Sequence, residues 1–263
     1  MSQTHKNDRD RFADVISCRA FWRFKNGFVV ASIIVIVSFC FLIVHNVSGK
    51  ITPEDTIALK KIMKSVEKGN ISSFSKEIQL IRDVQDAVLD ASPTLLKIPL
   101  RQTREPQDLL DAGHGQCSDR GRTIEKALKY YGFDVRFVSV FSRNKTFIPP
   151  ETMAIDSGND LRSHALVEVK TSRGWMFVDT NERWLALDSE DNPVSLDTWK
   201  NVQNKDAFQW SPDNVGDIYW LLRREFTIIY GLYTRHGQFY PPYTPYVPDM
   251  NIQTMVKGHL LSW

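Results

Sequence analysis

The longest uninterrupted apolar stretch of the chain lies near its N-terminus. Residues 28–44 read FVVASIIVIVSFCFLIV and contain neither a charged residue nor a polar face. With the uncharged residues up to position 48, the stretch reaches the roughly 20 residues that span the hydrocarbon core of a bilayer. Three basic residues lie shortly before it: Arg19, Arg23 and Lys25. The positive-inside rule therefore predicts a transmembrane helix over 28–48, with residues 1–27 in the cytoplasm.

A cleaved signal peptide is the alternative interpretation of the same stretch, with Val47-Ser48-Gly49 as a weak cleavage site. The 27 residues before the apolar run are many for a signal peptide, and the run itself is longer than the usual stretch of about 7–15 residues. We therefore expect an uncleaved anchor. Both interpretations place the rest of the chain on the far side of the membrane.

Two amphipathic helices are predicted in the juxtamembrane region, residues 49–98. The first begins at Thr52-Pro53, because proline in the first turn is a typical helix start, and Gly69-Asn70 ends it. The second carries an apolar stripe from Phe74 to Val88 and ends at Pro93. We expect both helices to pack on the core of the domain rather than to form a stalk.

A third helix follows the glycine-rich turn Gly113-His114-Gly115-Gln116. Its apolar residues have the spacing of one helical face, and they are Ile124, Ala127, Leu128 and Tyr131. Gly132 ends the pattern. Cys117 therefore lies at or near the N-terminus of this helix. There the helix dipole and the unpaired N–H groups favour a thiolate over a thiol and can stabilise an oxyanion.

A β-hairpin is predicted further along the chain. Residues 164–170 alternate in polarity, residues 171–174 form a turn, and residues 175–179 form the return strand. If Lys170 pairs with Trp175, the register of the hairpin is fixed.

This register places a histidine and an acid on the same face of the hairpin. His164 then lies opposite Asn181 and diagonal to Asp179, about 7–8 Å away along the backbone. Asp179 can accept a hydrogen bond from one imidazole nitrogen and leave the other nitrogen for Cys117. A slip of one residue would place His164 and Asp179 on opposite faces, so the inference depends on the turn.

The C-terminal region, residues 212–263, is predicted to contain a helix over 212–235 and an aromatic tail. The tail segment 239–246 is rich in Tyr and Pro and reads as extended chain. It either wraps the domain or binds a peptide, a sugar or a partner in envelope assembly. The polar segment 142–162 reads as a loop that overhangs the site.

Composition and charge exclude several classes of protein. Of the 263 residues, 42% are hydrophobic and 24% are charged, which is typical of a globular chain. The net charge is +2, and the excess of basic residues precedes the anchor. The exported part is therefore close to neutral and has no basic footprint for nucleic acid. Metal-ligand spacings and a phosphate-binding glycine loop are missing from the sequence, so neither a metal nor another cofactor is predicted.

Of the three cysteines, Cys117 is the one candidate for a functional thiol. Cys18 precedes the apolar run, Cys40 lies inside it, and only Cys117 belongs to the exported part. A lone thiol in an oxidising compartment is a liability unless it is used, although a buried and inert cysteine is the plain alternative. A thiolate nucleophile needs an imidazole partner, and an acid can orient that imidazole. Cys117, His164 and Asp179 are therefore the candidate catalytic residues.

These motifs resemble the transglutaminase-like superfamily, which has the papain-like cysteine-enzyme fold. The family pattern is Gly-x-Cys at a helix start, a helix ending in Gly, a strand, and then a hairpin that carries His on one strand and Gly-Trp and Asp on the other. Here the pattern reads Gly115-Gln116-Cys117, Tyr131-Gly132-Phe133, His164-Ala165-Leu166 and Gly174-Trp175 through Asp179. The resemblance covers residues 100–185. It implies an α+β fold, with a nucleophile helix packed on an antiparallel sheet and a catalytic core at 99–211.

The sequence departs from the family pattern beside the candidate site. Gly121 stands where the family often has alanine, and Leu166 stands where it often has tryptophan. The pattern also marks no second donor for an oxyanion beside the Cys117 N–H group. The candidates for this role are Gln102, Gln107 and Gln116, and Asn181 is expected to support the site.

The resemblance implies acyl transfer at an amide of a peptide or protein, with hydrolysis and transfer to an amine both open. One alternative is a non-catalytic binding or scaffold module on the same fold, acting in cell-envelope or polysaccharide assembly. A weaker alternative is an anchored protein that works through its aromatic tail. The expected setting is a bacterial inner membrane, spanned once, with the main domain in the periplasm.

Overall fold

The architecture is described from a computed structural model of the chain. The structure describes residues 43–67, 69, 71–143 and 161–260, together with residues 29, 31–33, 35 and 36. Residues 1–44 and 45–263 form two separate compact units. All elements described below belong to the second unit, which is called the domain.

The predicted membrane span falls mostly outside the described residues. Among those that are described, no helix is both long enough and apolar enough to cross a membrane. The last four residues of the predicted span, 45–48, are part of the folded domain instead. Asn46 pairs with Met250 in an isolated β-bridge, and Val47 is buried. The prediction of a helix up to residue 48 is therefore wrong at its C-terminal end.

Four helices precede the sheet: α2 (Pro53–Ile62), α3 (Phe74–Ala91), α4 (Pro106–Ala112) and α5 (Cys117–Tyr130). Thr52 caps α2 in a reciprocal arrangement with Asp55, because each side chain accepts a hydrogen bond from the other residue's backbone N–H. The predicted helices that correspond to α3 and α5 are confirmed. The predicted start of α2 is also confirmed, but α2 ends at Ile62 and not at Gly69-Asn70 as predicted. The short helix α4 was not predicted.

The main sheet has four antiparallel strands in the order β3-β2-β1-β4. Their bounds are β1 Asp134–Arg143, β2 Leu161–Thr171, β3 Gly174–Val178 and β4 Thr227–Tyr230. The predicted hairpin is β2–β3. Lys170 pairs with Trp175, so the predicted register is confirmed. The predicted loop 142–162 lies mainly outside the described residues, and its ends are strand residues of β1 and β2.

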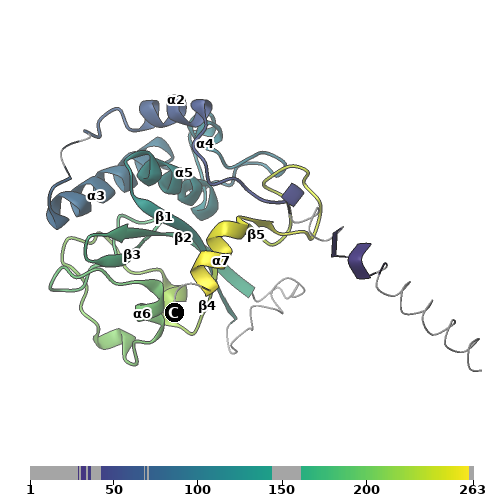
Figure 1. The fold of residues 1–263 in the computed structure, drawn as a ribbon. Helices are drawn as coiled ribbons and strands as arrows, with labels where there is room; N and C mark the ends of the chain where they lie inside the picture. Colours follow the sequence, from purple (N-terminus) through teal and green to yellow (C-terminus); the bar gives the residue numbers. More distant parts are fainter. Residues whose placement is uncertain are drawn as a thin grey trace, which may run out of the picture. The chain divides into compact units, whose positions relative to one another are not determined.

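Helix α5 packs on β1 and β2, and α3 packs on the outside of α5. The four helices α2 to α5 lie together above the sheet in Figure 1. Close packing between α5 and the sheet depends on Gly121. A Cβ atom added to this residue would lie only 3.1 Å from the side chains of both Phe137 and Thr180. The family alanine at this place would therefore crowd the helix against the sheet. This architecture, with helices packed on an antiparallel sheet, agrees with the α+β fold expected from the sequence.

The prediction of a helix over 212–235 is wrong. This region contains the 3₁₀ turn η3 (Trp220–Arg223), strand β4 and strand β5 (Leu232–Thr234). Gly231, with φ of +71°, separates the two strands. The run Thr227-Ile228-Ile229-Tyr230 is β-branched and aromatic, and β4 pairs with β1 at the sheet edge. Long-range pairing has therefore overridden a weak helical pattern.

The C-terminal helix lies later in the chain than predicted. The remaining elements are α6 (Leu196–Lys200), η2 (Lys205–Ala207), β6 (Asp249–Met250) and α7 (Ile252–Leu260), and β6 pairs with β5. Phe239 and Tyr240 of the aromatic tail are buried, and the Arg104 guanidinium lies 4.2 Å from the Phe239 ring centroid. This part of the tail therefore wraps the domain.

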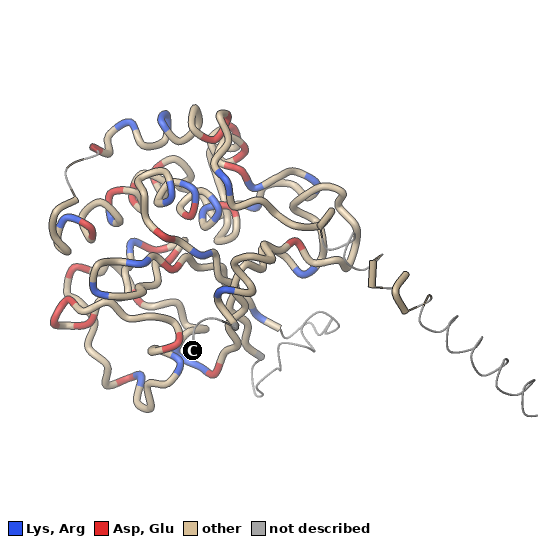
Figure 2. Tube along the Cα trace, in the orientation of Figure 1, with Lys and Arg blue, Asp and Glu red and all other residues tan. Residues whose placement is uncertain are grey.

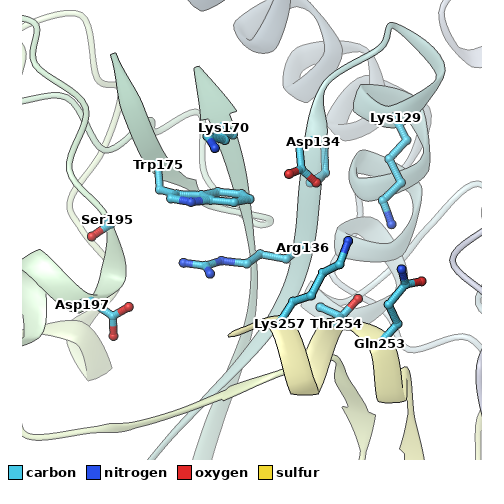
Figure 3. A pocket seen from close by; sticks show the side chains of 11 residues that line it. Lys129, Asp134, Arg136, Lys170, Trp175, Ser195, Asp197, Gln253, Thr254 and Lys257 are labelled. Atoms are coloured by element: carbon cyan, nitrogen blue, oxygen red, sulfur yellow. The ribbon is translucent and has the colours of Figure 1, made fainter. Parts of the chain in front are cut away.

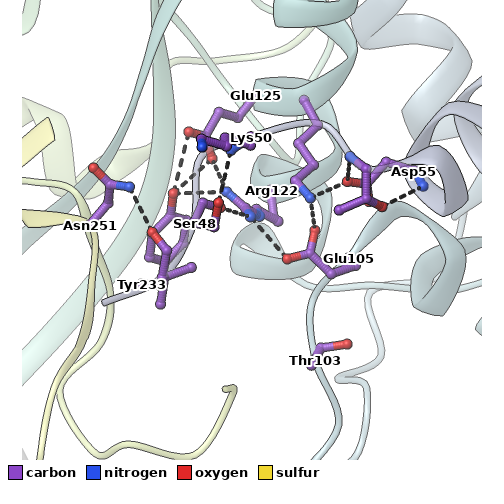
Figure 4. Close-up of polar contacts among 12 residues, drawn as sticks. Ser48, Lys50, Asp55, Thr103, Glu105, Arg122, Glu125, Tyr233 and Asn251 are labelled. Carbon is purple, nitrogen blue, oxygen red and sulfur yellow. Dashed lines mark hydrogen bonds and ion pairs between the residues drawn. The ribbon is translucent and has the colours of Figure 1, made fainter. Parts of the chain in front are cut away.

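A buried network of charged groups joins α5 to the segments around it (Figure 4). Arg122 donates to Glu105, Glu125 and the Tyr233 hydroxyl at 2.9, 3.0 and 2.9 Å. Lys126 contacts both Asp55 and Glu105. Arg122, Glu125 and Lys126 are all at most 2% exposed. Because each buried charge has partners of the opposite sign, the network fixes the position of α5 relative to α2 and α4.

Candidate active site

Cys117 is the first residue of α5, as the glycine turn and the apolar spacing predicted. Gly113 ends α4 in the left-handed conformation with φ of +64°, where glycine has no steric cost. Gly115 is buried, and a Cβ atom on it would lie 2.6 Å from Leu109. The two glycines therefore let the chain turn tightly from α4 into the start of α5.

Asp119 holds the first turn of α5 in place. Its carboxylate accepts hydrogen bonds from the backbone N–H groups of Gln116 at 2.9 Å and Ile98 at 3.3 Å, and it forms an ion pair with Arg104 at 2.9 Å. The N–H groups of Cys117 and Ser118 have no hydrogen-bond acceptor among the described residues. These two donors, at the positive end of the helix dipole, are suited to an oxyanion.

His164 lies on β2 and Asp179 directly follows β3. His164 Nε2 is 3.2 Å from Asp179 Oδ2, and both side chains are almost fully buried. The other carboxylate oxygen of Asp179 accepts from the N–H groups of Asn181 at 2.7 Å and Glu182 at 3.1 Å. With Nε2 bonded to Asp179, the other imidazole nitrogen is left for an interaction with the Cys117 thiol, which contributes to the raised pKa of His164. The diagonal placement predicted from the hairpin register is therefore observed.

The electrostatics of the three side chains favour a charged pair. Burial acts to lower the pKa of His164, but the charge and hydrogen bond of Asp179, together with Cys117, raise it to about 10. Burial acts to raise the pKa of the Cys117 thiol, but the hydrogen bond and charge of His164 and the backbone of Ala165 lower it below its ordinary value. The arrangement therefore favours a thiolate beside an imidazolium.

The predicted supporting residues are placed as follows. Asn181 accepts a hydrogen bond from Arg120 at 3.3 Å, and its backbone N–H holds Asp179. Gln116 is the N-cap residue of α5 and its side chain is exposed. Gln107 donates to Asp111 at 2.7 Å, and Gln102 is exposed on a turn. Asn181 is thus connected to the site, whereas no contact joins Gln102 or Gln107 to Cys117 among the described residues.

Two residues that contact the site were not predicted from the sequence. The Tyr219 ring stacks on the His164 imidazole, with centroids 4.2 Å apart and planes inclined by 26°. Gln85, fully buried in α3, donates through Nε2 to the carbonyl oxygens of Asp179, Glu182 and Trp184 at 2.7 to 3.0 Å. Gln85 could have been found from the sequence, because it is a polar residue among the apolar positions Ile81, Val84 and Val88 of the same helix. No periodic pattern marks Tyr219.

A separate cavity of about 550 Å³ lies near the other end of the sheet (Figure 3). It is lined by side chains of both charges, among them Lys129, Asp134, Arg136, Lys170, Asp197 and Lys257. Lys170 is six residues from His164 along β2, which corresponds to about 20 Å in a strand. This cavity is therefore distinct from the candidate active site. In the described part of the chain, no three His, Cys, Asp or Glu side chains are arranged to hold a metal ion.

The comparison with known families agrees with this geometry. Residues 66–180 match the family model of the transglutaminase-like superfamily. The matched range contains Cys117, His164 and Asp179, and it also includes α3 with Gln85. No curated protein matches the chain. The chain therefore contains a domain of the transglutaminase-like superfamily.

Proposed function

We propose that the chain is a membrane-anchored, extracytoplasmic cysteine enzyme that transfers the acyl group of a peptide or protein amide. The observation that carries the proposal is the position of His164, which is hydrogen-bonded to Asp179 and lies close enough to the Cys117 thiol for each group to shift the pKa of the other. Nucleophile, base and orienting acid are then contributed by three separate elements. A buried, inert cysteine would need none of these partners.

In the proposed reaction, the Cys117 thiolate attacks the carbonyl carbon of the amide. The negative charge that develops on the carbonyl oxygen is stabilised by the N–H group of Cys117 at the start of α5. The His164 imidazolium gives its proton to the leaving nitrogen as the C–N bond breaks, and a thioester remains on Cys117. His164 then takes a proton from water or from an amine, which attacks the thioester and releases the acyl product.

The membrane anchor is part of the proposal and is supported by the end of the apolar stretch. Cleavage of a signal peptide at Val47-Ser48-Gly49 would remove Val47, which is only 4% exposed. The N–H of Val47 donates to Met250 O at 2.8 Å, and its carbonyl accepts from Asn251 Nδ2 at 2.6 Å. A residue held in this way belongs to the mature domain. Residues 28–44 still provide 17 uncharged positions, which is at the short end of the range for a span.

The test is the pH dependence of iodoacetamide alkylation of residues 45–263, which form a compact unit of their own and contain Cys117 as the single cysteine. We expect fast alkylation at neutral pH, because the thiol pKa is lowered. His164→Ala should confine alkylation to pH values above about 8.5, the pKa of an ordinary thiol. His236→Ala, which changes a histidine outside the site, is the control. Equal profiles for the parent protein and His164→Ala would leave the scaffold alternative.

A further inference from the structure

The first residues of the domain are held within its fold. His45 and Val47 are 7% and 4% exposed, and Arg122 Nη2 donates to the carbonyl of Ser48 at 2.6 Å. Ile252 N–H donates to the side chain of Asn46 at 2.9 Å. If residues 28–44 cross the membrane, as proposed above, residue 45 follows the span directly in the sequence, and the surface beside residue 45 is a candidate for contact with lipid.

Two loops surround this start, residues 93–101 and residues 236–248. They are joined by the hydrogen bond from Arg101 N–H to Gln238 O at 3.0 Å. The second loop is tied back to β6 by Phe239 N–H, which donates to Asp249 at 3.0 Å, and β6 is where Asn46 pairs. Because Asn46 pairs with Met250 of β6, the start of the domain lies beside β6, to which the second loop is bonded.

The outer side of these loops carries an exposed apolar surface. Leu95, Leu96 and Leu100 are 56%, 56% and 47% exposed, and Tyr246 is 80% exposed. Ile98, between the leucines, is buried, so the loop is anchored by one residue while its neighbours point outward. We call Leu95, Leu96, Leu100 and Tyr246 the leucine surface. Isolated exposed leucines are common, but three within six residues beside one chain end are not explained by folding.

The charges around the leucine surface are of one sign. Residues 93–101 and 236–248 contain no Asp or Glu, and the first loop carries the exposed Lys97 and Arg101. Figure 2 colours the basic and acidic residues along the described chain. Apolar side chains interleaved with basic ones are the composition that binds the interface of an anionic bilayer. An anionic lipid surface therefore suits these two loops, because residue 45, which lies beside them, directly follows the proposed span in the sequence.

We propose that the leucine surface lies in the headgroup region of the membrane and fixes the orientation of the domain there. The proposal rests on the proposed membrane anchor and goes beyond it, because an anchor alone sets no orientation. Lys97 and Arg101 contact lipid phosphates, and the leucines insert between the headgroups.

This orientation also identifies a substrate class. Gly115 N–H donates to Thr94 O at 3.1 Å, and His114 Nδ1 lies 2.8 Å from Leu96 O. The loop with the leucines therefore contacts the turn that precedes Cys117 by two residues. The nucleophile lies near the lipid-facing end of the domain, and the amide it attacks belongs to a molecule that is itself attached to the membrane.

The test uses the full chain in vesicles of phosphatidylcholine and phosphatidylglycerol, with all three native cysteines changed to serine. Single cysteines are introduced by Leu96→Cys, Tyr246→Cys and, as the control, Ser172→Cys, and each is labelled with bimane. Ser172 is exposed on the β2–β3 turn, at the opposite end of β2 from His164. Quenching is measured with lipids that carry a nitroxide close to the headgroup. Retention of the chain in vesicles after carbonate extraction is measured separately.

We expect the chain to resist extraction and the probes at positions 96 and 246 to lose most of their fluorescence, while the probe at position 172 keeps its own. If the chain is retained but all three probes are quenched equally little, the orientation is overturned and the anchor stands. If the fluorescence of the probes at positions 96 and 246 shows that they are shielded from water, but nitroxide lipids do not quench it, a second protein copy covers the surface and the proposal is wrong. If the chain is extracted, anchor and orientation both fail, whereas the alkylation test of the enzyme is unaffected.

Discussion

The phenol ring of Tyr219 lies nearly parallel to the imidazole of His164, with ring centroids 4.2 Å apart. Tyr219 belongs to the irregular segment just before η3, so this contact brings a part of the chain far from the hairpin onto the candidate base. The ring is stacked on the imidazole, and His164 and Asp179 are both almost fully buried. We expect the stacked ring to limit the access of water to the imidazole and to restrict its rotation.

Replacing Tyr219 should therefore change the reactivity of Cys117. We expect Tyr219→Leu to lower the rate of alkylation at neutral pH by about 2- to 10-fold, from the typical energy of an aromatic pair. The midpoint of the pH profile should move upward, because a hydrated imidazole stabilises the thiolate less. Tyr219→Phe keeps the ring and should match the parent protein. Identical loss in both variants would point to the hydroxyl rather than to the stack.

Asp179→Asn tests the charge that supports His164. The charge and hydrogen bond of Asp179 raise the pKa of His164 to about 10, so their loss should return it toward the ordinary value. Less imidazolium then faces the thiol, the pKa of Cys117 rises, and alkylation at neutral pH should slow by about tenfold for each unit of that rise. Asp188→Asn, at an acid outside the site, is the control. An unchanged pH profile would contradict the role given to Asp179.

Gly121→Ala tests the close contact between α5 and the sheet. The added methyl group would lie 3.1 Å from Phe137 and Thr180. We expect a loss of about 1–3 kcal/mol in the free energy of unfolding, measured with urea, and slower alkylation of Cys117. The double variant Gly121→Ala with Phe137→Leu should recover part of both. A more stable protein with unchanged alkylation would mean that the helix propensity of alanine outweighs the crowding.

Arg122→Met should destabilise the domain strongly. The substitution leaves Glu105 and Glu125 next to each other in the buried network without their shared cation. Breaking a buried pair in this way costs about 3–5 kcal/mol. Arg183→Met removes the exposed ion pairs with Asp86 and Asp90 and should cost at most about 1 kcal/mol. Urea unfolding of residues 45–263 compares the two, and similar losses would contradict the importance of the network.

A domain that begins at residue 50 should be less stable than one that begins at residue 45. The shorter protein lacks buried Val47 and the carbonyl of Ser48 that accepts from Arg122. We expect a loss of about 2–4 kcal/mol in the free energy of unfolding, from one buried apolar side chain and several hydrogen bonds. Equal thermal and urea stability of the two proteins would show that residues 45–49 are dispensable and would again permit a cleavage site there.

Most of the helical layer and the hairpin that carries His164 and Asp179 could be predicted from local patterns. The positions of Cys117, His164 and Asp179 depend on one helix start and one tight turn, both of which have clear signals in the sequence. Periodicity reports which face of an element is buried, and the period of two along β2 was enough to place His164 and Asp179 together.

The edge strand and the supporting contacts could not be predicted in this way. Strand β4 forms because Thr227–Tyr230 pairs with β1, some 90 residues earlier, and its short β-branched run alone does not identify that partner. Tyr219 reaches His164 from an irregular segment, and Arg122 joins parts of the chain that are distant in sequence. These features depend on tertiary packing, which overrides the propensity of a short segment.

Gln85 sets a limit on how far the chain can be shortened without disturbing the candidate site. Its amide donates to three carbonyl groups of the loop that contains Asp179, and it comes from α3, ahead of Cys117 in the chain. A fragment cut to the predicted core, 99–211, would lose these hydrogen bonds. The site can therefore be transplanted to another protein only if α3 is included together with the hairpin.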